Sequence, residues 1–412
     1  MSRFFQVLII LLLFVPHVSA LAFSPPPEAP EPPLRQSWQV TFPGERGVMQ
    51  VISTGGMLYL VTKEGIIHAL EAASGREIWQ VSCWESPLVQ RCPYDPPIEP
   101  EAWEYPVYPE LTGAKERIVL AGEVLVAGFC TGSTYGGTQA EILATSFDIS
   151  SGDMLWTRPL GVGGVAGTAG KLVVLNTDLG IMGVEGTTGE PAWLVEKGDF
   201  AFLRASLVAE GAVFAFKRKE EWGNTSYIAY DAIDGSILWE WEEGEYYIHL
   251  LGAAGGRFFT LSGSYEQPVM LSAHDVRSGQ KLWACELGWS DSVIYYTGMA
   301  FQGGTLYLGG GSSWMPAGLA AIDAATGQIL WKTLAEVGGD KVALLGDTVY
   351  LLAWVNYQRR IYAVDALTGQ VKWAGLESEE LTLHGSDGAK LYVSAPSGPQ
   401  KNDPVLTAYE PR

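Results

Sequence analysis

The sequence predicts an all-β protein, an eight-bladed ring of four-stranded antiparallel blades, and three observations support this prediction. A short string recurs along the chain: a small residue, a carboxylate two positions later, glycine four after that and tryptophan four after the glycine. Successive tryptophans of the string are 37 to 48 residues apart, except for one interval of 77. One copy is split between the two ends of the chain. Periods of this size with strand character indicate a propeller or an array.

Each copy of the string describes a strand, a tight turn and a returning strand. In the copy from Ala321 to Trp331, Asp323 ends the first strand and Gly327 supplies the left-handed residue of the turn. We expect the tryptophans and glycines of the string to be structural docking residues. The tryptophans are Trp38, Trp79, Trp156, Trp193, Trp239, Trp283, Trp331 and Trp373, and the glycines are Gly75, Gly152, Gly189, Gly235, Gly279, Gly327 and Gly369.

The split copy predicts how the ring closes. Ala408, Tyr409 and Glu410 end the chain where a turn should begin, while Trp38 has no first half before it. A four-stranded sheet with one free edge is not stable alone in water, and closing the ring removes this problem. We therefore expect the strand around Trp38 to complete the blade whose inner strands come from the C-terminus.

The recurring string resembles the tryptophan-docking repeat of the pyrroloquinoline-quinone-type propellers. This family includes quinoprotein dehydrogenases and the outer-membrane assembly protein BamB, and the similarity extends from about Trp38 to Glu410. The resemblance implies that each indole lies between adjacent blades and that the small residue leaves space for it. Ser146 and Gly183 replace alanine at the small position, and glutamate replaces aspartate in three copies.

The N-terminus predicts an exported protein. Residues 1–20 combine a positive charge, a short apolar run and a small-residue cleavage signal, which is typical of a signal peptide. The run is too short to cross a membrane, so we expect no transmembrane segment in the mature chain, the alternative being an uncleaved anchor. No cysteine follows the run, which predicts no lipid anchor. Residues 21–34 are rich in proline and predict an extended linker, and 35–412 would form the propeller.

Composition and charge fit a secreted all-β protein. The 412 residues include 49 glycines and 15 tryptophans, which suit many turns and large flat packing residues. The formal net charge of −20 argues against binding to nucleic acid, whose phosphates require a basic patch, and against an anionic membrane surface.

The interval of 77 residues predicts an insertion rather than a ninth blade. Its second half is a blade of normal size, so the excess falls at 81–113, between one blade's outer strand and the next blade's inner strand. Cys83 and Cys92 lie in this proline-rich segment, and a disulfide between them would staple it; free thiols are the alternative. The sequence leaves open whether Cys130 and Cys285 pair.

Two faces of the ring should differ. All seven intact glycine turns have the same length and open on one face, whereas the long, variable loops open on the other. Aromatic residues lie in or next to these loops and make that face the candidate partner-binding face, although each could instead pack a loop onto the ring. They are Trp84, Trp103, Tyr105, Tyr108, Trp222, Tyr265, Trp289, Trp314 and Tyr357.

No catalytic motif is evident in the sequence. The histidines show no metal-ligand spacing, and there is no nucleophile elbow or phosphate loop. The carboxylates of the string are interpreted as turn residues that accept bonds from the turn's own N–H groups. The resemblance implies that the family's enzymes bind pyrroloquinoline quinone with calcium on the central axis, many beneath a pair of adjacent cysteines. This chain has no adjacent cysteines.

We therefore predict an exported, periplasmic or extracellular propeller that acts without catalysis as a scaffold for a protein partner in the cell envelope, as BamB does. No catalytic, cofactor or metal residues are assigned. Two alternatives stay open: a pyrroloquinoline-quinone-dependent dehydrogenase, and an extracellular ligand-binding or adhesion module. Fold alone does not decide between them.

Overall fold

Eight four-stranded antiparallel sheets account for all the strands of the computed structural model, which confirms the all-β prediction. The described residues are 32–45, 47–82, 118–130, 142–161, 163–220, 225–242, 247–264, 267–289, 297–311, 316–398 and 401–412. They all fall in one unit, Pro32–Arg412. No helix in these ranges is long and apolar enough to cross a membrane. The expected signal peptide, and the expected insertion after its first two residues, lie outside the described residues.

Consecutive strands along the chain form each of the first four sheets, here called blades A to D and given from the innermost strand outward. Blade A has β2 (Val48–Thr54), β3 (Met57–Thr62), β4 (Ile66–Glu71) and β5 (Glu77–Ser82). Blade B has β6 (Ile118–Ala121), β7 (Val124–Cys130), β8 (Ile142–Asp148) and β9 (Met154–Gly161). Blade C has β10 (Gly164–Ala169), β11 (Leu172–Thr177), β12 (Gly180–Glu185) and β13 (Pro191–Glu196). Blade D has β14 (Phe202–Ala209), β15 (Ala212–Arg218), β16 (Ser226–Asp231) and β17 (Ile237–Glu242).

Blades E to G follow the same order, and blade H uses both ends of the chain. Blade E has β18 (Tyr247–Ala254), β19 (Arg257–Ser264), β20 (Gln267–Asp275) and β21 (Lys281–Glu286). Blade F has β22 (Thr297–Gln302), β23 (Thr305–Gly311), β24 (Pro316–Asp323) and β25 (Ile329–Thr333). Blade G has β26 (Gly338–Leu345), β27 (Thr348–Val355), β28 (Gln358–Asp365) and β29 (Val371–Ser378). Blade H has β30 (Thr382–Ser386), β31 (Leu391–Gly398), β32 (Lys401–Pro411) and β1 (Leu34–Thr41).

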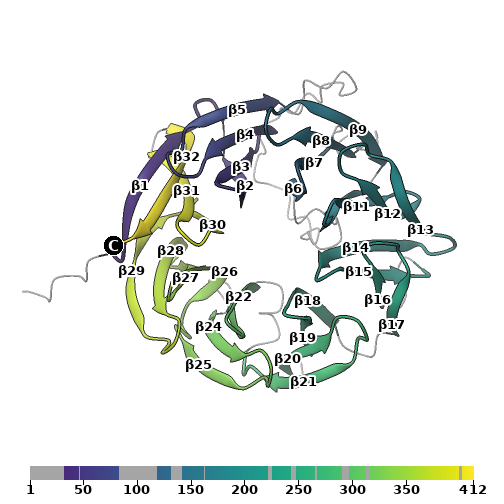
Figure 1. The fold of residues 1–412 in the computed structure, drawn as a ribbon. Helices are drawn as coiled ribbons and strands as arrows, with labels where there is room; N and C mark the ends of the chain where they lie inside the picture. The colour runs from purple at the N-terminus through teal and green to yellow at the C-terminus, as the bar shows by residue number, and fades with distance from the viewer. Residues whose placement is uncertain are drawn as a thin grey trace, which may run out of the picture. The chain divides into compact units, whose positions relative to one another are not determined.

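The ring closes through blade H, as the split copy predicts. β1 pairs antiparallel with β32, from Leu34 opposite Pro411 to Thr41 opposite Val405. Figure 1 shows the eight sheets around a common centre, with the N-terminal strand β1 beside the C-terminal strand β32. The N-terminal strand is therefore the outer strand of the last blade.

The core is divided among the joints between blades. Eight clusters of buried side chains each combine residues from two neighbouring blades. In one of them, Tyr59 and Ile67 of blade A pack with Leu125 and Phe147 of blade B. Because both faces of a blade are covered by its neighbours, the middle strands read as nearly continuous apolar runs.

Each docking tryptophan lies directly opposite the small residue of its own blade. The register pairs are Ala69 with Trp79, Ser146 with Trp156, Gly183 with Trp193, Ala229 with Trp239, Ala273 with Trp283, Ala321 with Trp331, Ala363 with Trp373 and Ala408 with Trp38. Facing residues of an antiparallel pair lie within about 5.5 Å, so a large side chain at the small position would compete with the indole for space.

Seven of the eight tryptophans donate a hydrogen bond to the next blade. In each case the indole Nε1–H donates to the carbonyl oxygen of the residue that follows the carboxylate of the neighbouring turn. The pairs are Trp38 with Ala72, Trp79 with Ile149, Trp156 with Gly186, Trp193 with Ala232, Trp239 with Val276, Trp283 with Ala324 and Trp331 with Ala366, at 2.8–3.2 Å. An indole N–H that is removed from water needs such a partner.

The glycine of each turn is required for two reasons, as Gly327 illustrates. Its φ of +75° lies in the left-handed region, which side chains other than glycine rarely adopt. A Cβ added there would lie 2.5 Å from Cε3 of Trp283, so the indole covers the place that a side chain would need. The turn and the docking tryptophan therefore fit together only when this residue is glycine.

A second aromatic contact supports the tryptophan in five blades. An aromatic residue of the blade's second strand lies with its ring centroid 5.9–6.2 Å from that of the motif tryptophan. These residues are Tyr59, Phe214, Phe259, Tyr307 and Tyr392. The sequence analysis missed them, although they stand at a fixed place in the second strand.

Candidate functional site

The ring has two faces with different chemistry. Because the strands of each blade alternate in direction, the hairpin between strands one and two and the glycine turn between strands three and four open on one face. We call this the turn face. The hairpin between strands two and three opens on the opposite face, together with the link to the next blade, and we call this the loop face.

The turn face is uniform. In all seven glycine turns the glycine N–H donates to the carbonyl oxygen of the carboxylate residue at 2.8–2.9 Å. The carboxylates of Asp148, Asp275, Asp323 and Asp365 accept hydrogen bonds from N–H groups of their own turns. Hydrogen bonds to the charged form lower the pKa of each of these four carboxyl groups. These contacts confirm the interpretation as turn residues for these four motif carboxylates.

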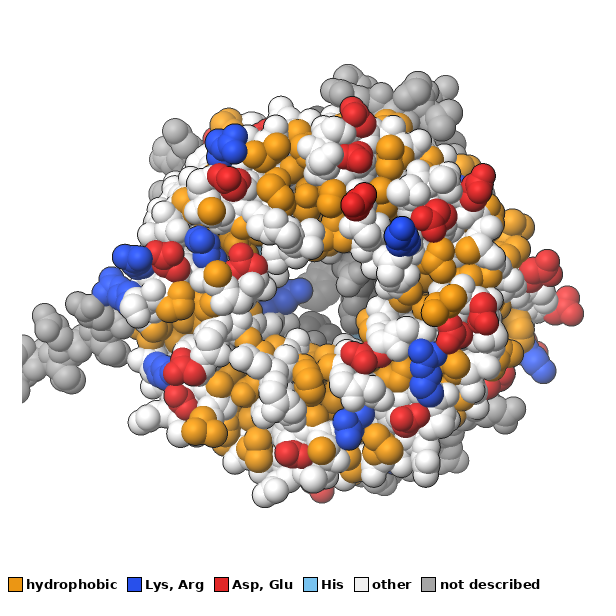
Figure 2. Space-filling view, viewed as in Figure 1, with side chains coloured by type: hydrophobic (Ala, Val, Ile, Leu, Met, Phe, Trp, Pro, Cys, Tyr) orange, Lys and Arg blue, Asp and Glu red, His pale blue; other side chains and the backbone are white. Residues whose placement is uncertain are grey.

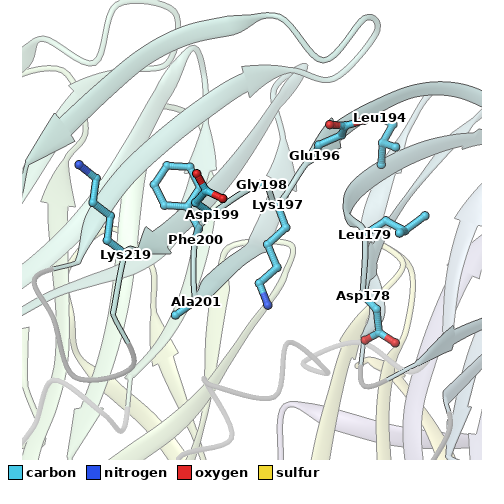
Figure 3. A pocket seen from close by; sticks show the side chains of 10 residues that line it. All are labelled: Asp178, Leu179, Leu194, Glu196, Lys197, Gly198, Asp199, Phe200, Ala201 and Lys219. Carbon is cyan, nitrogen blue, oxygen red and sulfur yellow. The ribbon is translucent and has the colours of Figure 1, made fainter.

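The loop face carries a pocket between blades C and D (Figure 3). Its volume is about 600 Å³. Three segments line it: the β11–β12 hairpin, the end of β13 with its link to β14, and the end of β15. The lining residues are Asp178, Leu179, Leu194, Glu196, Lys197, Gly198, Asp199, Phe200, Ala201 and Lys219.

Backbone contacts fix the two walls of the pocket that blade C supplies. The N–H of Lys197 donates to the carbonyl of Leu179 at 2.7 Å, which joins the β13–β14 link to the β11–β12 hairpin. Gly180 has a φ of +138°, and a Cβ there would lie 2.1 Å from the carbonyl oxygen of Val195. Glycine at this position therefore lets the hairpin approach β13 closely.

The charged groups of the pocket are three carboxylates and two ammonium groups. Glu196 and Asp199 are exposed, and neither makes an ion pair or a side-chain hydrogen bond within the described part of the chain. Asp178 interacts with the guanidinium of Arg204. Burial lowers the pKa of this guanidinium, and the negative charge of Asp178 opposes the shift by raising it. In Figure 3 the side chain of Lys219 extends away from the other lining residues. Glu196 and Asp199 are therefore available to a ligand.

The apolar part of the pocket consists of two exposed leucines and a phenylalanine. Leu179 is 64% exposed and Leu194 is 39% exposed. The ammonium group of Lys217 lies 4.7 Å from the ring centroid of Phe200, a cation–π contact, and also pairs with Glu240 at 2.8 Å. The sequence analysis did not find this pocket, because its segments are separated along the chain and carry no motif.

Two of the nine aromatic residues expected on the loop face lie among the described residues, and the structure places them differently. Tyr357 lies at the tip of the β27–β28 hairpin and is 65% exposed. Trp289 differs from the expectation: it is only 9% exposed and packs in the core between blades E and F, so it is not a surface anchor. The other seven lie outside the described residues: Trp84, Trp103, Tyr105, Tyr108, Trp222, Tyr265 and Trp314.

Of the four cysteines, Cys285 carries a free thiol, and burial raises the pKa of this thiol. It is therefore not paired with Cys130. The predicted disulfide between Cys83 and Cys92 lies outside the described residues.

The described histidines have partners within the fold. Nε2 of His68 lies 3.1 Å from a carboxylate oxygen of Glu45, and both side chains are buried. Burial lowers the pKa of His274 to about 4 and that of His384 to about 3. Among the described residues, no group of three or more His, Cys, Asp or Glu side chains could hold a metal ion.

The innermost strands carry one carboxylate, that of Asp340 in β26, whose side chain is partly buried. Burial raises its pKa, and the charges of Arg359 and Lys341 oppose this rise. Arg359 also lies over the ring of Trp354, 4.6 Å from its centroid. Calcium requires six to eight oxygen ligands, whereas the charged groups that act on this carboxylate are two cations. These residues do not fit a quinone with its calcium, because the cations repel the metal and Arg359 covers the indole.

The fold and the docking geometry define a class: eight-bladed propellers with tryptophan-docked joints. The chain belongs to the family of the outer membrane protein assembly factor BamB, whose model matches residues 139–255 and 269–401, more than half of the chain. This match confirms the resemblance to the pyrroloquinoline-quinone-type propellers. No curated protein sequence matches the chain.

Solved structures with the same fold come from two functional classes. BamB from Moraxella catarrhalis has a TM-score of 0.53 and 16% identity over 92% of this chain and 97% of its own. The quinohemoprotein alcohol dehydrogenase ADHIIG from Pseudomonas putida HK5 has a TM-score of 0.52 and 13% identity over 92% of this chain and 76% of its own. A europium-containing methanol dehydrogenase has a TM-score of 0.54 and 11% identity over 92% and 93%. At these identities the likeness concerns the fold alone.

Proposed function

We propose that this protein is an exported, non-catalytic scaffold that binds a protein partner of the cell envelope through its loop face. The observation that carries the proposal is the contrast between the faces. On the turn face four motif aspartates accept hydrogen bonds from their own turns, whereas the loop face has a pocket of about 600 Å³ lined by the exposed carboxylates of Glu196 and Asp199. Membership of the family of an assembly factor supports a binding role. The signal-like N-terminus supports export.

Partner capture with matched surface variants tests the proposed face. Leu179→Ser with Tyr357→Ser removes two exposed apolar side chains from the loop face, and Ile233→Ser with Leu367→Ser removes two from the turn face. All four residues are exposed, so both variants should fold with unchanged melting temperatures. We expect the wild type and the turn-face variant to co-purify with the same partner from the native host, and the loop-face variant to lose it. Loss from the turn-face variant alone would place the function on the opposite face.

A thermal shift experiment addresses the dehydrogenase alternative. A ligand that binds only the folded state raises the melting temperature. We expect pyrroloquinoline quinone with calcium to leave the melting temperature unchanged, because the charged groups that act on Asp340 are cations. A clear rise, with reduction of a dye by alcohols or sugars, would contradict the scaffold proposal and support the enzyme.

A further inference from the structure

The innermost strands of the blades differ in charge from the rest of the chain. The whole sequence has 46 Asp and Glu residues against 26 Lys and Arg residues. The eight innermost strands, in contrast, carry one carboxylate, Asp340, and two cations, Arg204 and Lys341. Figure 2 shows an opening at the centre of the ring with a basic side chain at its wall. The centre of this acidic protein is therefore a place where a small anion meets little repulsion.

The joint between blades G and H is where the ionisable groups of the innermost strands gather. In six of these strands the register against the second strand shifts by one residue, as a β-bulge produces, and bulges re-aim side chains. In β26 and β30 the extra residues are Asp340 and His384, and both are ionisable. The extra residues of the other four strands are Met49, Ala166, Ser206 and Leu251.

Lys341 follows Asp340 on β26, and its side chain is exposed. It makes no ion pair and no hydrogen bond with the described part of the chain. Burial raises the pKa of Asp340 and lowers that of His384, and the positive charge of Lys341 lowers both. The ammonium group therefore lies close to both blades of this joint and keeps its three donors for a ligand.

Arg359 supplies a second cation, and its position is fixed. The guanidinium lies over the ring of Trp354, and Nη1 donates to the carbonyl oxygen of Leu381 at 3.0 Å. Nη2 lies 3.7 Å from a carboxylate oxygen of Asp340, which is too far for a hydrogen bond. Nε of Arg359 and Oδ1 of Asp340 are buried and have no hydrogen-bond partner among the described residues. The guanidinium thus has donors that its neighbours in the fold leave unused.

We propose that the centre of the ring binds a compact oxyanion such as phosphate at the joint between blades G and H, a function beyond the scaffold role. The ammonium group of Lys341 and the guanidinium of Arg359 provide the opposite charges, and the planar guanidinium matches the geometry of an oxyanion. A planar ring such as a quinone does not fit in the same place, because Arg359 covers the indole of Trp354. The carboxylate of Asp340 repels the anion and so limits the affinity.

Titration with inorganic phosphate tests the site. Binding is measured by isothermal titration calorimetry at pH 7, with sodium chloride at the same ionic strength as the blank. We expect Lys341→Gln to weaken phosphate binding by about tenfold, the effect of removing one charge at close range. The matched control is Lys171→Gln, which removes an exposed charge from the β10–β11 hairpin on the turn face and should change the affinity by less than about twofold. Equal affinities of the wild type and Lys341→Gln would overturn the proposal.

A variant that gains affinity guards against a loss caused by misfolding. Asp340→Asn keeps the shape of the side chain and removes the negative charge beside Arg359, so phosphate should bind about threefold more tightly than to the wild type. Weaker binding by this variant would contradict the proposal, because the site would then favour cations. A wild-type protein that binds no phosphate up to about 10 mM, or that responds to chloride as it does to phosphate, also overturns it.

Discussion

Seven joints of the ring are built alike, and the eighth is different. At the seven joints an indole from one blade donates to a carbonyl of the next blade and covers its glycine turn. The eighth joint lies between blades G and H, where the chain's two ends interrupt the turn between β32 and β1. Trp373, the tryptophan of this joint, makes no hydrogen bond among the described residues. The indole hydrogen bond is thus seen at the seven joints whose receiving blade has a continuous turn.

The eighth joint has no indole hydrogen bond among the described residues, although Trp373 still packs against the cluster that blades G and H share. Leu34 at the start of β1 is 4% exposed and packs in the cluster shared by blades G and H. Within blade H, the guanidinium of Arg35 pairs with Glu410 at 2.7 Å across the β1–β32 ladder. Trp373 lies close to its own strand, because a Cβ on Gly375 would be 2.2 Å from its Cζ2. Apolar burial by the N-terminal strand thus replaces the covalent turn.

The largest expected effect comes from opening the ring. Deleting Lys401–Arg412 removes β32, so β1 loses its partner and β31 gains a free edge. We expect the truncated chain to lose cooperative thermal unfolding, measured by circular dichroism at the strand signal. Deletion of residues 1–31 is the control and should leave the melt unchanged, since these residues lie outside the unit that contains the ring. A truncated protein that melts like the wild type would refute closure by β32.

The next effect compares one docked tryptophan with the undocked one. Trp331→Ala removes a ring that bonds to Ala366 and covers Gly369, so we expect a loss of about 3 kcal/mol in the free energy of unfolding. Trp373→Ala should cost less, about 1–2 kcal/mol, because no hydrogen bond is lost. Urea denaturation measures both values. Equal losses would mean that docking adds nothing beyond burial of the ring.

A third comparison separates backbone strain from the close contact with the indole. Gly369 and Gly346 have φ values of +73° and +62°, so alanine is strained at both positions. A Cβ at Gly369 would lie 2.6 Å from Trp331, whereas at Gly346 it would meet nothing within 4 Å. We expect Gly346→Ala to cost about 1 kcal/mol and Gly369→Ala about 3 kcal/mol in urea unfolding. If the two costs are similar, strain alone explains the glycine.

Most of the fold could be predicted from the sequence because the repeat is local. The carboxylate, the glycine and the tryptophan of one copy lie within nine residues, as from Asp323 to Trp331. A single copy is therefore enough to predict the geometry of the outer hairpin. The split copy then required closure by Trp38. The sequence could not indicate that Trp373 lacks a docking bond, because this depends on the neighbouring blade. The sequence also predicted Trp289 to be a surface residue, whereas the structure buries its side chain between blades E and F.

The pocket could not be predicted, because its parts come from three segments of two blades. Leu179, Leu194 and Lys219 are ordinary residues along the chain, and only the ring brings them to one cavity. A signal was present in Leu194, since the other seven blades have small or polar residues after the docking tryptophan. Position-by-position comparison of repeats would have found it, whereas a search for catalytic motifs does not.

The smallest expected effect concerns the turn that the seven docked joints share and the eighth lacks. Hydrogen bonds from Lys372 and Thr368 lower the pKa of Asp365 to about 2, from an ordinary value of 3.8. Because the pKa is lower in the folded state, this carboxylate stabilises the fold above about pH 4, and the contribution is lost as the pH falls toward 2.

Asp365→Asn should therefore lower the free energy of unfolding by about 0.5 kcal/mol at pH 7, a small value because the pair is partly exposed and solvent screens it. The difference between variant and wild type should be much smaller near pH 2, where about half of the wild-type carboxylate is protonated. Urea unfolding at both pH values measures it, and Lys372→Met should reproduce part of the loss at pH 7. A difference that persists unchanged at pH 2 would mean that the side chain acts through its shape and neutral hydrogen bonds. The seven turns would then hold the docking tryptophans without any contribution from charge.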